Sequence, residues 1–267
     1  MPLNPNRICL KILLLIVLGL IAGIAGGLLG IGGGALVVPG LVFLLNFNQH
    51  RAHGTSLAAV LAMSTAGTLT YWHHGHIDWL LTVEVAAGGM AGAMIGARIV
   101  GAIKSRTLQL MFCAFLALAG GRMIVAGLAQ GANGVNTACI HYTLASVMFA
   151  VLIGVASGML SAILGVGGGV VMVPAMVLLL CVPQKTAQGV SLAAIAPIAF
   201  TGMLAHRAMG NVDSRAAVWV GLGGLAGAVT GATAMSGLAS SALKLAFGAF
   251  LIIMSTMLAL KRQNKRE

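Results

Sequence analysis

The chain carries one glycine-rich stretch twice, first as Leu29-Gly30-Ile31-Gly32-Gly33-Gly34-Ala35-Leu36-Val37-Val38-Pro39 and again as Leu164-Gly165-Val166-Gly167-Gly168-Gly169-Val170-Val171-Met172-Val173-Pro174. The two copies lie 165 − 30 = 135 residues apart. The same offset pairs His53-Gly54-Thr55-Ser56-Leu57-Ala58-Ala59 with Gln188-Gly189-Val190-Ser191-Leu192-Ala193-Ala194, and Gly75-His76-Ile77-Asp78 with Gly210-Asn211-Val212-Asp213. The sequence therefore predicts two copies of one structural unit, each interrupted by glycines at the same place.

The composition is that of a protein embedded in lipid. Hydrophobic residues make up 59% of the chain and charged residues 7%, and the mean hydropathy is +1.03. These values exclude an ordinary soluble domain. Apolar runs typical of membrane helices recur along the whole length. They are Ile12–Leu28, Gly33–Phe47, Gly54–Trp72, Leu80–Val100, Leu108–Gly127, Tyr142–Ala162, Gly168–Val182, Gly189–Met209, Ala216–Met235 and Ala242–Leu260. We expect an all-α polytopic membrane protein with a glycine-broken hairpin and about three spanning helices in each repeat.

The net charge of +11 is carried at the ends of the apolar segments, so it does not indicate nucleic-acid binding. Suppose that the first two segments of each repeat return to the side from which they start. The positive-inside rule then places twelve of the 15 basic residues in the cytoplasm. These are Arg7, Lys11, Arg51, Arg98, Lys104, Arg106, Arg207, Arg215, Lys261, Arg262, Lys265 and Arg266. Each repeat then crosses the bilayer an odd number of times, so the second repeat is inverted and both termini are cytoplasmic.

The expected organisation has four parts. A first transmembrane repeat occupies 12–127, and an outer linker occupies 128–141. The second, inverted repeat occupies 142–260, and a basic cytoplasmic tail occupies 261–267. We expect the tail to lie near anionic lipid headgroups rather than to bind a ligand.

The glycine motif interrupts an apolar stretch at membrane depth. Its glycines disfavour a helix, each by about 1 kcal/mol relative to alanine, and irregular backbone at that depth must be buried or line a wet cavity. A helix that starts just after the break presents N–H groups without intrahelical partners, and a small anion is their natural ligand. We therefore expect a substrate-binding site that is formed by Gly32, Gly33, Gly34, Gly167, Gly168 and Gly169.

Close helix packing is the alternative explanation for these glycines. It is the preferred explanation for two other sets of glycines, in which the spacing is strictly four residues. These sets are Gly88, Gly92 and Gly96 in the first copy, and Gly223, Gly227 and Gly231 in the second. Small residues at this spacing let neighbouring membrane helices approach closely.

Ser56 and Ser191 are the hydroxyl residues that we expect in the substrate-binding site. They occupy matching positions in the two copies, and each hydroxyl either binds the anion or completes the first turn of a helix. His53 matches Gln188, and either side chain could reach into a cavity. His53 is also a candidate for proton coupling, because histidine titrates near neutral pH.

Glu84 is the second candidate for proton coupling. It lies inside an expected span, where an acidic side chain is costly and is often functional. Asp78 and Asp213 each precede a span, and we expect both to be helix N-caps.

The doubled Leu-Gly-Ile/Val-Gly-Gly-Gly…Val-Pro motif resembles the TauE/SafE family of sulfite-exporter-like membrane permeases. The Gly-x-Ser-Leu-Ala-Ala and Gly-x-Ile/Val-Asp elements resemble that family too, and the resemblance covers nearly the whole chain. It implies a bacterial inner-membrane carrier for a small sulfur-containing anion such as sulfite or an organosulfonate. Together with inverted repeats, it suggests a secondary transporter that works by alternating access, with a proton as a candidate coupled ion.

Two other classes of function stay open at this point. An anion channel would need no coupling ion, and a membrane-embedded enzyme or assembly subunit would bind without translocating. We do not expect an enzyme, because the chain has four acidic residues, no nucleophile-elbow serine and no P-loop. We likewise expect no cofactor and no bound metal.

Overall fold

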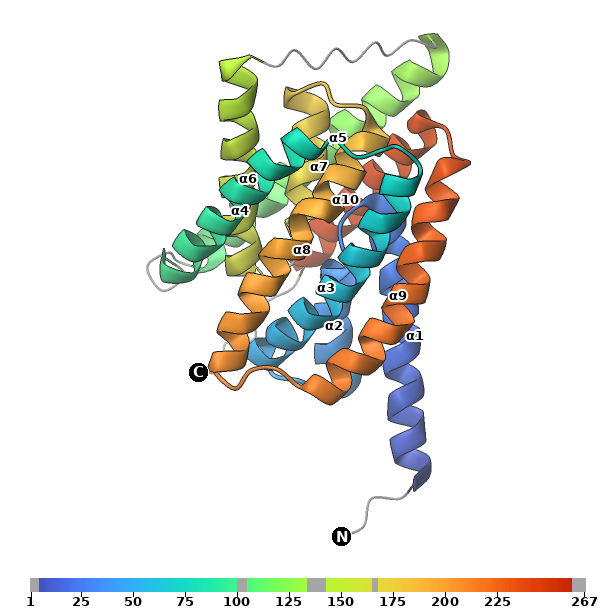
Figure 1. The fold of residues 1–267 in the computed structure, drawn as a ribbon, viewed down its shortest axis with the longest axis vertical. Coiled ribbons are helices and arrows are strands. Elements are labelled where there is room, and N and C mark those ends of the chain that lie inside the picture. The colour runs from blue at the N-terminus through green and yellow to red at the C-terminus, as the bar shows by residue number, and fades with distance from the viewer. Residues whose placement is uncertain (1–4, 100–104, 134–142, 165–167, 261–267) are drawn as a thin grey trace.

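The computed structural model describes residues 5–99, 105–133, 143–164 and 168–260, which form ten α-helices (Figure 1). In chain order they are α1 (Pro5–Leu29), α2 (Gly34–Leu45), α3 (Gln49–His73), α4 (Trp79–Ile99), α5 (Ser105–Asn133), α6 (Leu144–Leu164), α7 (Gly169–Leu179), α8 (Gln184–Ala208), α9 (Ser214–Ser236) and α10 (Ser240–Leu260). Each apolar segment expected from the sequence coincides with one helix, so the all-α class is confirmed for the described residues. Part of the expected linker, 128–133, belongs to α5. The rest of it, 134–141, and the tail at 261–267 lie outside the described residues.

The first glycine motif forms a turn between α1 and α2. Gly30, Gly32 and Gly33 have φ angles of 74°, 72° and 79°, in the left-handed region that strains other residues. Helix α1 therefore ends at Leu29 and α2 begins at Gly34.

Seven helices are long and apolar enough to cross a membrane, namely α1, α4, α5, α6, α8, α9 and α10. Helices α2 and α7 have 12 and 11 residues. At 1.5 Å per residue they are about 18 and about 17 Å long, roughly half of a bilayer's hydrocarbon core. Helix α3 has 25 residues but is more polar, and its Thr55, Ser56 and Ser64 are buried in the protein. The chain is thus a multi-pass membrane protein with seven candidate spans and two shorter apolar helices.

Helix α1 packs along α9, and α4 packs along α6, with glycines at the contacts. A Cβ atom added at Gly92 would lie 2.7 Å from Val155 Cα of α6, and one added at Gly227 would lie 2.8 Å from Ile24 N of α1. There is no room for a side chain at these distances. The glycine sets with four-residue spacing are therefore helix-packing sites, as their spacing predicts.

Backbone features recur at the offset of 135 residues. Gly75 and Gly210, which follow α3 and α8, both have a φ of 71°. Asn46 and Cys181, which follow α2 and α7, have φ angles of 53° and 54°. Corresponding loops of the two halves therefore share their local backbone conformation.

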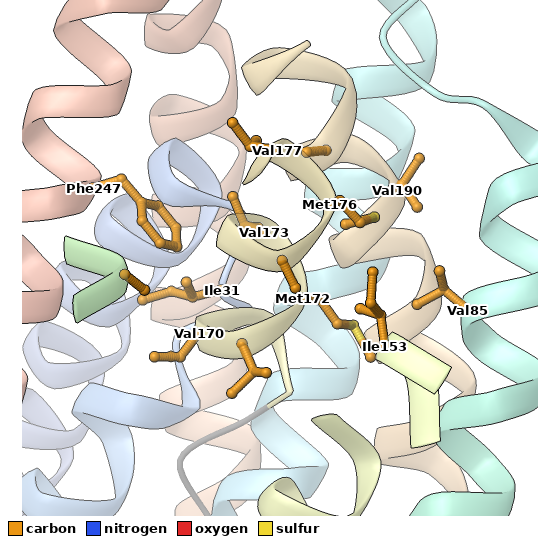
Figure 2. Packing of buried hydrophobic residues seen from close by; sticks show 14 of the residues in the cluster. Ile31, Val85, Ile153, Val170, Met172, Val173, Met176, Val177, Val190 and Phe247 are labelled. Carbon is orange, nitrogen blue, oxygen red and sulfur yellow. The ribbon is translucent and has the colours of Figure 1, made fainter. Parts of the chain in front are cut away.

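The two short helices differ in how deeply they are buried. Every residue of α7 from Gly169 to Val177 is buried, whereas α2 buries four residues. Figure 2 shows Val170 and Val173 of α7 in one apolar cluster with Ile31 of the glycine turn and Phe247 of α10. Helix α7 is therefore enclosed by protein, and α2 has a more open face.

The packing role of the spaced glycines can be tested with Gly92→Ala. The added methyl group would overlap the α6 backbone, so we expect a loss of about 1–3 kcal/mol in stability, measured by thermal unfolding in detergent. Gly121→Ala in α5 is the matched control, because no heavy atom lies within 4 Å of the added Cβ. Equal melting temperatures for the two variants would contradict the packing role.

Candidate functional site

The two glycine interruptions meet in the interior of the protein. A Cβ atom added at Gly169 would lie 2.7 Å from Ile31 Cα and 2.8 Å from the carbonyl oxygen of Gly30. One added at Gly30 would lie 2.6 Å from Gln188 Cα of α8. The turn after α1, the start of α7 and the first half of α8 are thus in backbone contact, which requires residues without side chains.

Gly32, Gly33 and Gly34 end the first interruption, and all three are buried. A Cβ atom added at Gly32 would lie 3.3 Å from Val60 Cγ1 of α3 and 3.2 Å from Ile195 Cγ2 of α8. Gly33 is the N-cap of α2 and has a left-handed backbone. In the first turn of α2, Leu36 N donates to the Gly33 carbonyl at 3.0 Å, so the N–H groups without a helical partner are those of Gly34 and Ala35.

Gly168 and Gly169 begin the second short helix. Gly168 is the N-cap of α7 with a φ of −63°, which any residue adopts. A Cβ atom added there would lie 3.1 Å from the flexible end of Met172. Gly167 lies outside the described residues. The aligned residues Gly33 and Gly168 therefore differ in conformation, although both precede a short helix.

Helices α3 and α8 cross in opposite directions beside the glycine turn (Figure 1). Residues at positions i, i+4, i+7 and i+11 lie on one face of a helix. On α8 these positions are Gln184, Gln188, Ser191 and Ile195, and on α3 they are Gln49, His53, Ser56 and Val60. We call these sets the α8 stripe and the α3 stripe; they are related by the offset of 135 residues. Since Val60 and Ile195 both contact the Gly32 position, the two stripes end at the same point.

The α8 stripe is more deeply buried than the α3 stripe. Gln184 is 1% exposed, and Gln188 and Ser191 are 0% exposed. On α3, Ser56 is also buried, but His53 is half-buried and Gln49 is exposed. The crossing is therefore closed at the end where α8 begins and more open at the end where α3 begins.

Tyr71 connects α3 to both α1 and α8. Its hydroxyl donates to the carbonyl oxygen of Gly27 at 3.0 Å and lies 3.2 Å from Gln188 Oε1. Gly27 is in the last turn of α1, where carbonyl groups lack helical partners. Tyr71 therefore caps α1 beside the glycine turn and holds the amide of Gln188. The Nε2 atom of Gln188 and both amide atoms of Gln184 are buried without a hydrogen-bond partner in the described structure.

The two predicted serines are both buried within the stripes. Ser191 donates to Met172 Sδ of α7 at 4.0 Å, and a thioether is a weak acceptor. Ser56 occupies the equivalent position on α3. The hydroxyl of Ser191 is therefore available for a stronger acceptor, such as an anion.

The two candidates for proton coupling lie on different helices. His53 is on the α3 stripe, one turn from the exposed Gln49. Glu84 is half-buried in α4, five residues before Gly89, where α4 contacts Met172 and Ile198. The described contacts do not bring Glu84 and His53 together.

Both aspartates predicted as N-caps are confirmed in that role. Asp213 Oδ1 accepts from Arg215 N at 3.1 Å at the start of α9, and Asp78 Oδ1 accepts from Leu81 N at 3.1 Å at the start of α4. Asp213 also forms an ion pair with Arg51 at 2.7 Å. That ion pair, which joins the starts of α3 and α9, is not apparent from the sequence.

A separate pocket of roughly 340 Å³ opens between α3, α8 and α9. Its lining is apolar except for Arg207 and Ser214, and it includes none of the predicted site residues. Within the described ranges, no group of three or more His, Cys, Asp or Glu residues could hold a metal ion.

Gln184 and Tyr71 are not among the site residues that the sequence predicts. A signal for Gln184 exists, because polar residues recur at i, i+4 and i+7 in both copies. Tyr71 has no such signal, because its hydrogen-bond partners lie 44 and 117 residues away along the chain. Only the folded structure brings these residues together.

The chain matches the family model described as sulfite exporter TauE/SafE over residues 4–144 and 150–267. The probable membrane transporter protein YunE of Bacillus subtilis is 32% identical over 223 residues, which cover 76% of this chain and 81% of YunE. The probable membrane transporter protein YdhB of the same organism is 27% identical over 221 residues, covering 82% and 89%. The probable membrane transporter protein MJ0441 of Methanocaldococcus jannaschii is 29% identical over 199 residues, covering 72% and 71%. No solved structure matches this chain.

The capping role of Tyr71 can be tested with Tyr71→Phe. This change leaves the buried Gly27 carbonyl without its donor, so we expect a loss of about 1–3 kcal/mol in stability, measured by thermal unfolding in detergent. Thr65→Val is the control: it removes a hydroxyl that is exposed on α3, whereas that of Tyr71 is buried, and it should change the melting temperature little. Unaltered stability of Tyr71→Phe would show that the hydroxyl does not hold the turn.

Proposed function

The chain belongs to the sulfite exporter TauE/SafE family of membrane transporters, and on this basis we propose that it is a secondary transporter that moves a small sulfur-containing anion, such as sulfite or an organosulfonate, across the bacterial inner membrane. Membership in this family makes the chain a transporter of a small substrate and not an enzyme. The observation that carries the proposed substrate class is the contact between the two glycine interruptions in the interior.

The glycine contact suits a small anion for electrostatic reasons. Helices α2 and α7 both begin in this buried region, at Gly34 and Gly169. The third N–H group of each helix donates to the N-cap carbonyl, so the first two N–H groups of each helix are the ones without helical partners, and the helix dipole adds partial positive charge there. Two such helix ends can bind one oxyanion through neutral groups. The buried hydroxyls of Ser56 and Ser191 would complete the site.

The proposed architecture is a pair of inverted repeats at 12–127 and 142–260. Each repeat contains a hairpin, α1–α2 or α6–α7, followed by three spans. In Figure 1, α3 and α8 run in opposite directions, and α1 packs on α9 as α4 packs on α6. Helix α3 counts as a span because Thr55, Ser56 and Ser64, which make it more polar, are buried in the protein. In this arrangement each repeat crosses the bilayer an odd number of times, so both termini lie in the cytoplasm. The two halves can then exchange conformations during alternating access.

Proton coupling is the second part of the mechanism that we propose. His53 lies on the more open α3 stripe, and Glu84 lies in α4 within five residues of its contact with α7. A proton that binds to either side chain would change the local charge as the anion enters or leaves.

The proposed function can be tested by uptake into proteoliposomes. We expect saturable uptake of sulfite, thiosulfate or sulfoacetate that responds to an imposed proton gradient, with sulfate, chloride and a neutral solute as comparisons. Uptake that follows only the anion's own gradient and carries channel-sized currents would replace the carrier with an anion channel. If none of the anions moves, the proposed function is wrong.

The glycine site can be tested with Gly168→Ala. The backbone of Gly168 tolerates a side chain, and the added methyl group would stand at the first turn of α7, so we expect a folded protein with a KM raised at least fivefold, equivalent to about 1 kcal/mol. Gly33→Ala makes a contrast, because a φ of 79° and Ala22 O at 2.8 Å should destabilise the fold. A normal KM in Gly168→Ala would remove the α7 terminus from the site.

A further inference from the structure

Gln184 and Gln188 lie one turn apart on the α8 stripe and are buried with unpaired amide groups. Their exposed fractions are 1% and 0%. Among the residues that the structure describes, Gln188 Nε2 has no hydrogen-bond partner, and neither amide atom of Gln184 has one. Buried polar groups are nearly always paired in native proteins, and an unpaired one is costly. Two such side chains in succession therefore indicate a site that is completed by a group outside the described residues.

The position of the two amides connects them to the glycine contact. Gln188 Cα is the atom that Gly30 approaches, and Gln188 Oε1 lies 3.2 Å from the hydroxyl of Tyr71. This contact holds one end of the Gln188 amide and leaves the other end without a partner among the described residues. Gln184 lies one turn nearer to the start of α8. The unpaired groups thus form a line that leads from the closed end of the crossing to the glycine turn.

The side-chain amides can bind an oxyanion that moves along a permeation path. An amide NH2 group donates hydrogen bonds and carries no charge, so it can bind an anion without holding it as tightly as lysine or arginine would. Groups that line a permeation path must bind well enough for entry and weakly enough for release. Helix α8 begins on the outer side in the proposed orientation, so this line of amides faces outward.

We propose that Gln184 and Gln188 bind the transported anion in the outer half of its path, through buried amide groups that have no hydrogen-bond partner among the described residues. This inference rests on the proposed function. The equivalent residues of the α3 stripe, Gln49 and His53, are exposed and half-buried, which agrees with a structure that is more open on the inner side. When the outer half opens, Gln184 and Gln188 become accessible and meet the anion before it reaches the glycine contact.

The first test combines transport with stability, using sulfite uptake into proteoliposomes and thermal unfolding. Gln184→Met and Gln188→Met keep the side-chain volume and remove the amide. We expect each variant to raise the KM for sulfite on the order of tenfold, the effect of one lost hydrogen bond to a charged group. Gln184→Met should melt at or above the wild-type temperature, because it removes an unpaired buried group. Thr233→Val on the exposed face of α9 is the control and should alter neither quantity.

A second measurement reports on access to the same residues. Gln184→Cys, in a chain whose four native cysteines are replaced by alanine, should react with a membrane-impermeant maleimide added outside, and sulfite should slow the reaction. Unchanged KM values, or labelling that sulfite does not slow, would overturn this proposal while leaving the proposed function intact. A structural role alone would lower the melting temperature of Gln184→Met without raising the KM, and that result would also overturn it. If the wild-type chain takes up no sulfite, the proposal fails together with sulfite as the substrate.

Discussion

The structure depends on placing irregular backbone at membrane depth without exposing it to lipid. Peptide groups without partners are very costly in a hydrocarbon environment, and the backbone at Gly30–Gly33 leaves the helical conformation. Helices α7 and α8 pack closely on this turn and shield it from lipid, while Ile31 N donates to the Gly26 carbonyl and the Tyr71 hydroxyl donates to the Gly27 carbonyl at the end of α1. Because such packing needs backbone-to-backbone contact, glycine is required at Gly30 and Gly169. The apolar cluster around α7 and the tight glycine contacts of α1 with α9 and of α4 with α6 hold these elements in place.

Much of the fold could be predicted from the sequence, because its determinants are local. Ten apolar segments become ten helices, Asp78 and Asp213 are N-caps, and the glycines spaced by four residues are packing sites. The helix ends extend beyond the apolar cores, as at Gln49 of α3, because polar residues near the membrane surface can continue a helix. The different conformations of Gly33 and Gly168 could not be predicted from two matching motifs.

The candidate site could be predicted less completely. The glycines and the two serines stand out in the repeat, but the environment of each depends on contacts between distant segments. The hydrogen bond that joins Tyr71 to Gln188 spans 117 residues. The two copies also differ chemically at these positions. At the offset of 135 residues, Tyr71 aligns with His206, and Gln188 aligns with His53. The buried pair of Tyr71 and Gln188 thus corresponds to two histidines in the other half.

The central claim is that a sulfur oxyanion binds where the two glycine interruptions meet. The most direct measurement is an experimental structure of the protein in lipid with selenite, a heavier analogue of sulfite, located by the anomalous scattering of selenium. We expect a selenium peak within hydrogen-bond reach of the first turn of α7 and of the α8 stripe. A peak confined to the pocket beside Arg207, or no peak at a selenite concentration that inhibits sulfite uptake, would contradict it.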